Sequence, residues 1–489
     1  MKKLGLSSIL FCLFLISCGP DDGGDILGRP FSGNADFSRF MVVGDGFAAG
    51  YMDGALYQTG QDNSIANLLA QQAAATVNNP SPFLQPDIQS EVGFGGFDAQ
   101  NNPLGKFALK NVEGFDTPLP VRQPGVPPSF YTENPAFLNN FSVPEAKVLD
   151  ASVPGYGQRN LFYGRFASSQ PTSTIIGDAV NASPTFFMFW MGYRDILNYA
   201  MNGATGKDGG TGTNDMTSVE NFRIAYQAAI NGLLSTGAKG VLLNYPDIIH
   251  LPFFNSLPPR AVYTTTQDST DLWNQYFEYN IAAAGWNTDL RFQGLTAEEI
   301  EVRTRPLIIF EDEGLSPVVI EDPSLVDASI IMPNGTFFEI PKIRQLRATE
   351  FLLLSFPFDE LKNGAGTSIP LDKKYALTDK EIEKVRQRIT DFNRIIQDIV
   401  NDNPEQLNLI NINFDVRELF GGFPSQLNGA LVDASIQPNL GLFSADGVHF
   451  NPRGNAHFTN KIIEGINKLY SANLFFLDAS QYKANDPAL

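Results

Sequence analysis

The sequence predicts an α/β protein whose central parallel sheet is covered by helices on both faces. Unbroken apolar runs recur along the chain and stop at Gly or polar residues, as strands buried on both faces do. Amphipathic helical patterns separate these runs. The chain has 489 residues, of which 43% are hydrophobic, and this is enough apolar material for a large core.

The N-terminus is predicted to be a targeting signal. Lys2 and Lys3 precede a short apolar run, which is typical of a secretory signal peptide. The run ends in Leu-Ile-Ser-Cys at Cys18, which resembles the bacterial lipobox. That resemblance implies cleavage before Cys18 and lipidation of its thiol, so that Cys12 leaves with the peptide and Cys18 attaches the protein to a membrane. The alternative is an ordinary cleaved signal with an incidental Cys18.

The first half of the domain begins with a strand predicted over 40–43, which ends at Gly44. Ser64 is predicted to cap the next helix, whose apolar residues recur at helical spacing. Residues 76–145 are rich in Pro, Gly, Asn and Phe, and they predict a long ordered insertion. A short strand is predicted over 147–150.

The second half continues the alternation of strands and helices. Apolar runs predict strands over 185–190, 240–244 and 407–412. Capping boxes predict helix starts at Thr217 with Glu220 and at Thr378 with Glu381, and a last helix is predicted after Pro452. Residues 250–375 break the alternation and indicate an inserted subdomain. The predicted organisation is a signal peptide (1–17), a flexible tether (18–36), one domain (37–475) with insertions at about 76–145 and 250–375, and a C-terminal tail (476–489).

The charge and cysteine content exclude several classes of protein. There are 34 Lys and Arg residues against 53 Asp and Glu residues, which gives a net charge of −19. Such a surface repels phosphate backbones, so we expect no nucleic-acid partner. The two cysteines are too few for a disulfide scaffold or a zinc or iron–sulfur cluster, and the three histidines lack metal-binding spacing. We therefore expect no cofactor and no metal.

Asp446 and His449 form the most chemically suggestive pair in the chain. A carboxylate three residues before a His can accept the proton of one ring nitrogen, which leaves the other nitrogen free to act as a base. The other two histidines, His250 and His457, are interpreted as structural residues.

Four short motifs resemble, in order, those of the SGNH/GDSL hydrolases, which are esterases with a three-layer, flavodoxin-like fold. The matching segments are the strand end at Gly44–Gly46, the turn at Pro154–Gly155, Gly192–Asp195, and Asp446 with His449. The stretches AGYMDGALY and DGVHFNPRG are similar to those of SGNH-type lipoproteins of Bacteroidetes. The resemblance implies a catalytic Asp446–His449 pair, with oxyanion donors at the backbone N–H groups of Gly46 and Gly155.

The chain departs from the family at two site positions. Gly46 stands where the family has its nucleophilic Ser, and a glycine has no oxygen with which to attack an ester. Arg194 stands where the family has the Asn that donates to the oxyanion. One interpretation is structural, with Arg194 paired to Asp45, Asp195 or Asp446. The other is that Arg194 makes the pocket an anion site for a carboxylate or phosphate.

Two functions follow from these departures. The first is a catalytically inactive SGNH-like lipoprotein of the outer membrane, on the periplasmic face or the cell surface. It would act as a binding or accessory subunit, with an outer-membrane β-barrel protein or an anionic or acylated small ligand as partner. The alternative is an active esterase on acylated glycans or lipids, in which His449 directs a water molecule at the ester.

Overall fold

The computed structural model describes residues 28–78, 80–112, 117–290, 293–413, 425–427 and 430–486. The predicted signal peptide, Cys12, Cys18 and the first part of the tether therefore lie outside the described residues. The core is a four-stranded sheet in the order β1-β6-β7-β16. All its pairings are parallel, which confirms the predicted α/β class. The strands are β1 (Phe40–Gly44), β6 (Phe186–Trp190), β7 (Lys239–Leu243) and β16 (Leu407–Ile410).

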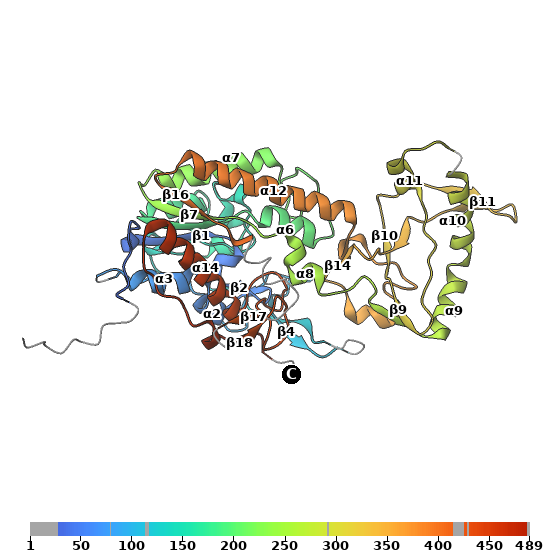
Figure 1. Ribbon diagram of the computed structural model, residues 1–489, viewed down its shortest axis with the longest axis horizontal. Helices are drawn as coiled ribbons and strands as arrows, with labels where there is room; N and C mark the ends of the chain where they lie inside the picture. Colours follow the sequence, from blue (N-terminus) through green and yellow to red (C-terminus); the bar gives the residue numbers. More distant parts are fainter. Residues whose placement is uncertain are drawn as a thin grey trace, which may run out of the picture.

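Helices cover both faces of this sheet, which explains why its strands are continuous apolar runs. Helices α7 (Val219–Leu234) and α12 (Asp379–Asp402) pack together on one face. Helices α3 (Ile65–Ala74) and α14 (Pro452–Tyr470) pack together on the other face, so the body has three layers (Figure 1). Every residue of β1 and β6 is buried between the two helical layers.

The helix starts largely follow the predicted caps. The Ser64 hydroxyl accepts the Asn67 N–H at the start of α3, and Thr378 with Glu381 forms the capping box of α12. Pro452 is the first residue of α14. The capping box predicted at Thr217 is wrong, because Ser218 caps α7 and the Thr217 hydroxyl instead donates to the buried Asp195 carboxylate.

The strand predicted over 147–150 is also wrong. These residues form a 3₁₀ turn at Val148–Asp150, where the Val148 N–H donates to Asp195 at 2.6 Å. The segment beside β1 is instead 139–143, inside the predicted first insertion. Its parallel contact with β1 consists of hydrogen bonds from Val42 N to Asn139 O (2.8 Å), Phe141 N to Val42 O (2.8 Å) and Val143 N to Gly44 O (2.9 Å).

The second predicted insertion forms a subdomain beside the three-layer body (Figure 1). Its own apolar core includes Leu272, Tyr276, Tyr279 and Phe310. Arg344 is buried there and pairs with Asp322 and Glu350, each at 2.6 Å. Its elements are α9 (Thr266–Gln275), α10 (Phe277–Leu290), α11 (Ala297–Arg303), β8 (Val262–Thr264), β9 (Gly314–Ser316), β10 (Val319–Glu321), β11 (Ser329–Ile331), β12 (Phe337–Glu339) and β13 (Ile343–Gln345).

The remaining elements are short and lie around the ends of the sheet. They are β2 (Tyr51–Met52), β3 (Ala55–Leu56), β4 (Leu104–Lys110), β5 (Leu119–Pro124), β14 (Phe351–Leu352), β15 (Ala376–Leu377), β17 (Ser425–Leu427), β18 (Ala430–Val432), α1 (Gly46–Ala49), α2 (Gln58–Asp62), α4 (Leu161–Gly164), α5 (Ile175–Asn181), α6 (Arg194–Met201) and α8 (Pro252–Asn255). Within the described ranges, no helix has the length and apolar character needed to cross a bilayer.

Candidate functional site

The predicted site lies where β1 ends and meets the loop before α14. The turn between β2 and β3 is held against that loop, although the two are 392 residues apart in sequence, because Gly54 N donates to the Asp446 carboxylate at 2.9 Å. Asp53 strengthens the tie, because its N–H donates to the Ser444 hydroxyl (2.9 Å) and its carboxylate accepts from Ala445 N (2.7 Å). These contacts place Asp446 and His449 directly above the residues that follow β1.

Asp446 is a buried carboxylate surrounded by N–H donors. It accepts from His449 Nδ1 at 2.8 Å and from the backbone N–H groups of Gly54 (2.9 Å), Val448 (2.8 Å) and His449 (2.9 Å). Burial by itself raises the pKa of Asp446, but the His449 ring and these hydrogen bonds outweigh it and hold that pKa well below its usual range. Asp446 is therefore anionic and orients the His449 ring.

The second ring nitrogen of His449 faces a guanidinium. Arg194 Nη2 lies 3.3 Å from His449 Nε2. Because a guanidinium can only donate, Nε2 accepts this hydrogen bond and the ring proton is on Nδ1, toward Asp446. The lone pair that a general base would use is thus engaged by Arg194. Within the described ranges, no Ser, Thr or Cys side chain hydrogen-bonds to this ring.

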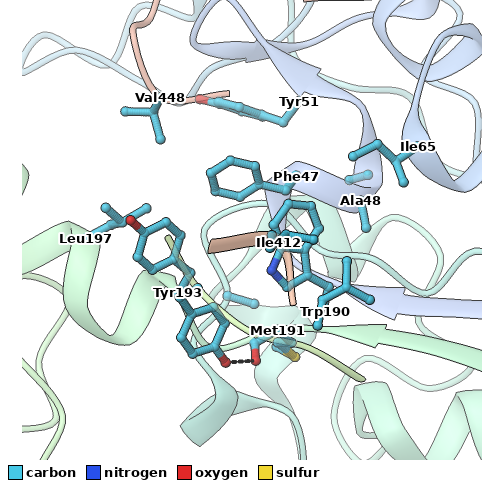
Figure 2. Close-up of a cluster of buried hydrophobic side chains, with 14 of the residues drawn as sticks. Phe47, Ala48, Tyr51, Ile65, Trp190, Met191, Tyr193, Leu197, Ile412 and Val448 are labelled. Carbon is cyan, nitrogen blue, oxygen red and sulfur yellow. Dashed lines mark hydrogen bonds between the residues drawn. The ribbon is translucent and has the colours of Figure 1, made fainter. Parts of the chain in front are cut away.

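Gly46, the first residue of α1, lies directly against this ring. A Cβ atom at Gly46 would stand 2.7 Å from His449 Nε2, closer than non-bonded atoms approach. The ring centroid lies 4.6 Å from that of Phe47 and 5.1 Å from that of Tyr51. Phe47 is in turn enclosed by Trp190, Tyr193 and Val448 (Figure 2). The His449 ring therefore occupies the space that a side chain at position 46 would need.

Arg194 is buried, but its partner differs from those predicted. Its ion pair is formed by Nη2 with Glu145 at 2.8 Å, and Nη1 donates to Asn198 at 3.2 Å. Asp195 is directed away, toward Val148 and Thr217. Burial by itself lowers the pKa of Arg194, but the Glu145 carboxylate, with smaller contributions from neighbouring groups, raises it above its usual value. The pairing predicted with Asp45, Asp195 or Asp446 is therefore corrected to Glu145.

The structure does not bring Gly155 into the site. The Gly155 N–H donates to Ser173 O at 3.2 Å, and a Cβ atom added at this position would stand 3.0 Å from Pro171 O. An oxyanion donor at Gly155 is therefore wrong, because this N–H already has a partner. Gly155 was expected in the turn that follows the strand beside β1. In the structure, the turn that follows the segment beside β1 is Pro144–Ala146, and Glu145 lies in it. Only Phe141 and Val143 are apolar in residues 139–143, so no signal in the sequence marked this segment.

A cavity of about 420 Å³ opens beside these residues. Arg194, Asp446 and His449 line it. Its other charged members, Glu145 and Arg122, carry no motif in the sequence. Arg122 donates to Gly54 O (2.7 Å) and Gly105 O (2.9 Å), and its guanidinium stacks 3.7 Å from the ring centroid of Phe107. The cavity is also lined by Tyr51, Gly54, Gly95, Phe107, Asn198, Met201, Asn202, Thr213, Asn214, Phe253, Ser355 and Val448.

The two remaining histidines do not join this site. His457 lies on α14, where burial, with a smaller contribution from Lys461, lowers its pKa to about 4. His250 ends the short turn Ile248–His250. Across the part of the chain that the structure describes, no three His, Cys, Asp or Glu side chains are grouped as metal ligands would be.

Asp45 carries a pH-dependent stability cost that a substitution can reveal. Burial raises its pKa to about 6, against the opposing effects of Arg194 and the Phe47 N–H. Because an Asp in an unfolded chain titrates near about 3.9, the folded protein binds this proton more tightly, and its loss costs stability between about pH 4 and pH 6. We expect the unfolding free energy of Asp45→Asn, taken relative to that of wild type, to rise by about 1 kcal/mol as the pH increases from about 5 to about 7. Urea unfolding at both pH values measures this, and a loss over the same interval would contradict it.

Comparisons with protein-family models, with curated proteins and with solved structures return no match to this chain.

Proposed function

We propose that this protein is a catalytically inactive SGNH-like lipoprotein, attached to the outer membrane through Cys18, that acts as a binding or accessory subunit of the cell envelope. The observation that carries the proposal is the position of the His449 ring. The ring stands against Gly46, and its Nε2 accepts from Arg194 at 3.3 Å. A base without a nucleophile, whose lone pair is already engaged, supports binding rather than ester cleavage.

The retained Asp446–His449 pair, at 2.8 Å, favours the alternative of an esterase on acylated glycans or lipids. That activity would require His449 to deprotonate a water molecule through Nε2. Arg194 opposes this step because it occupies the lone pair that would accept the proton. The hydrolytic route is therefore the weaker candidate.

The large inserted subdomain supports an accessory role with a protein partner. It exposes large apolar side chains at Tyr263, Phe277, Ile331 and Phe337, of which Phe337 is 69% exposed. Apolar side chains left in water on a folded domain are typical of interaction surfaces. The partner in this proposal is an outer-membrane β-barrel protein.

Ester hydrolysis tests the central claim. For the form that lacks residues 1–18, we expect no turnover of short-chain or medium-chain nitrophenyl esters, or of an acetylated glycan, above the buffer rate. His449→Ala should give the same baseline, because the wild-type ring performs no chemistry. Turnover by wild type that His449→Ala abolishes would contradict the proposal and favour the esterase.

A further inference from the structure

Glu145 is held in an unusual backbone conformation. Its φ is +64°, in the left-handed region that a residue with a Cβ atom adopts at some cost. It follows Pro144 in the turn after the segment beside β1. The side chain is 38% exposed, yet its carboxylate reaches inward to the buried Arg194 at 2.8 Å. This turn therefore directs one acidic side chain from the surface into the cavity.

Arg194 has binding capacity that Glu145 does not use. Its side chain is only 4% exposed, and the ion pair is formed through Nη2. In the described part of the chain, its Nε has no hydrogen-bond partner, and the same is true of Asn198 Nδ2. Both residues line the cavity and are more than nine-tenths buried. A carboxylate bound side-on to a guanidinium uses Nε together with one Nη, so Arg194 offers a fork of which only one side is occupied.

The charges lining the cavity balance while Glu145 is inside. Arg122 and Arg194 are opposed by Glu145 and the anionic Asp446. If Glu145 turns toward solvent, one positive charge in a buried place is left without its partner, which is costly unless another anion replaces it. A single negative charge restores the balance. A dianionic phosphate would exceed it in a chain whose net charge is already −19.

The walls of the cavity match a ligand with an apolar body. Phe107, Met201, Phe253 and Val448 line it. Its volume of about 420 Å³ is within the range of pockets that enclose small organic ligands. A cavity lined by both charged and apolar side chains can orient a carboxylate and enclose the chain attached to it.

We propose that Glu145 is an internal occupant of an anion subsite, and that the cavity binds a monocarboxylate with an apolar chain, whose carboxylate replaces that of Glu145 on Arg194. This inference rests on the proposed binding function. It adds the ligand class and a competing group within the chain. The apparent affinity for the ligand is then lowered by the fraction of molecules in which Glu145 holds Arg194.

Calorimetric titration with octanoate, octanamide and inorganic phosphate tests the inference. Octanamide has nearly the same shape as octanoate without the charge. We expect octanoate to bind wild type, and Glu145→Gln to bind it about three- to tenfold more tightly, because a partly exposed ion pair no longer competes. Glu145→Gly should show the same gain in octanoate affinity. Glycine adopts a φ of +64° without strain, so this variant keeps the test valid if Glu145→Gln fails to fold. Arg194→Lys should lose octanoate affinity by about tenfold, with octanamide little changed.

Glu220→Gln is the matched control. It removes the same charge from an exposed pair with Arg223 on α7, so it reports any general gain in anion affinity from the change in net charge. The inference is overturned if both Glu145 variants bind octanoate no more tightly than wild type, if Glu220→Gln gives the same gain, or if octanamide gains equally. Preference for phosphate over octanoate also overturns it. Nitrophenyl ester hydrolysis on the same samples reports separately on the proposed function, so the two failures are distinguishable.

Discussion

Gly46→Ser alone is expected to leave the protein without esterase activity, whereas Gly46→Ser combined with Arg194→Asn is expected to hydrolyse nitrophenyl acetate. A serine at position 46 would place its Cβ 2.7 Å from His449 Nε2, so the ring must move before the hydroxyl can be activated. Arg194 holds the ring in place through Nε2 at 3.3 Å. Replacing Arg194 by Asn frees that nitrogen and supplies a side-chain amide that can donate to an oxyanion. Glu145, being 38% exposed, can then turn to water.

We expect the double variant to exceed Gly46→Ser by at least about a hundredfold in kcat/KM, since general-base assistance contributes about that much or more. Arg194→Asn alone is the control, because it frees His449 without supplying a nucleophile. Adding His449→Ala to the double variant should return the rate to baseline. A Gly46→Ser variant as active as the double variant would show that Arg194 does not restrain the ring.

Asp446→Asn is expected to destabilise the fold by about 2–6 kcal/mol, the cost of leaving two buried N–H donors without an acceptor at about 1–3 kcal/mol each. The carboxylate accepts the His449 Nδ1–H and the N–H groups of Gly54, Val448 and His449. An amide supplies one acceptor oxygen and directs an NH₂ group at the remaining donors, which leaves buried N–H groups unsatisfied.

Chemical unfolding in urea at neutral pH measures this loss, because the depressed pKa keeps Asp446 ionised there. Asp327→Asn is the matched control. It makes the same substitution at a side chain that is 91% exposed and paired only with Lys342, so we expect little change. The hydrogen bond from the Gly54 N–H to the Asp446 carboxylate joins two segments that are 392 residues apart in the sequence, so the substitution should also weaken the contact between these segments. If Asp446→Asn lowers the unfolding free energy no more than Asp327→Asn does, the role assigned to the Asp446 carboxylate is contradicted.

The central sheet could be predicted from the sequence because the burial of each strand determines the residue types within that strand. Strands such as β1 and β6 are buried on both faces, so they appear as continuous apolar runs. The helix caps at Ser64 and Thr378 could also be predicted, because each capping side chain hydrogen-bonds to a backbone N–H only a few residues away. Asp446 and His449 are close in sequence, and their hydrogen bond follows from one tight turn.

The segment beside β1 could not be predicted in this way. Residues 139–143 include two Asn residues and no two consecutive apolar residues, so nothing local distinguishes them from the surrounding insertion. Their pairing exists because β1 offers them an open edge. Residues 147–150, with Val148 and Leu149 adjacent, were predicted as a strand, but the Asp195 carboxylate accepts the Val148 N–H that a strand would need.

The α/β class, the buried strands and the absence of a side chain at Gly46 all follow from the order of the residues along the chain. Tertiary structure decided what that absence means. Whether His449 is a free base depends on where its ring lies, and that position depends on Arg194, Phe47 and Gly46, which come from separate segments. The partner of Arg194 was decided in the same way, because Glu145 reaches it from a turn that carries no motif. Strand burial and helix caps are governed by neighbours in sequence, whereas ring placement and ion pairing are governed by neighbours in space.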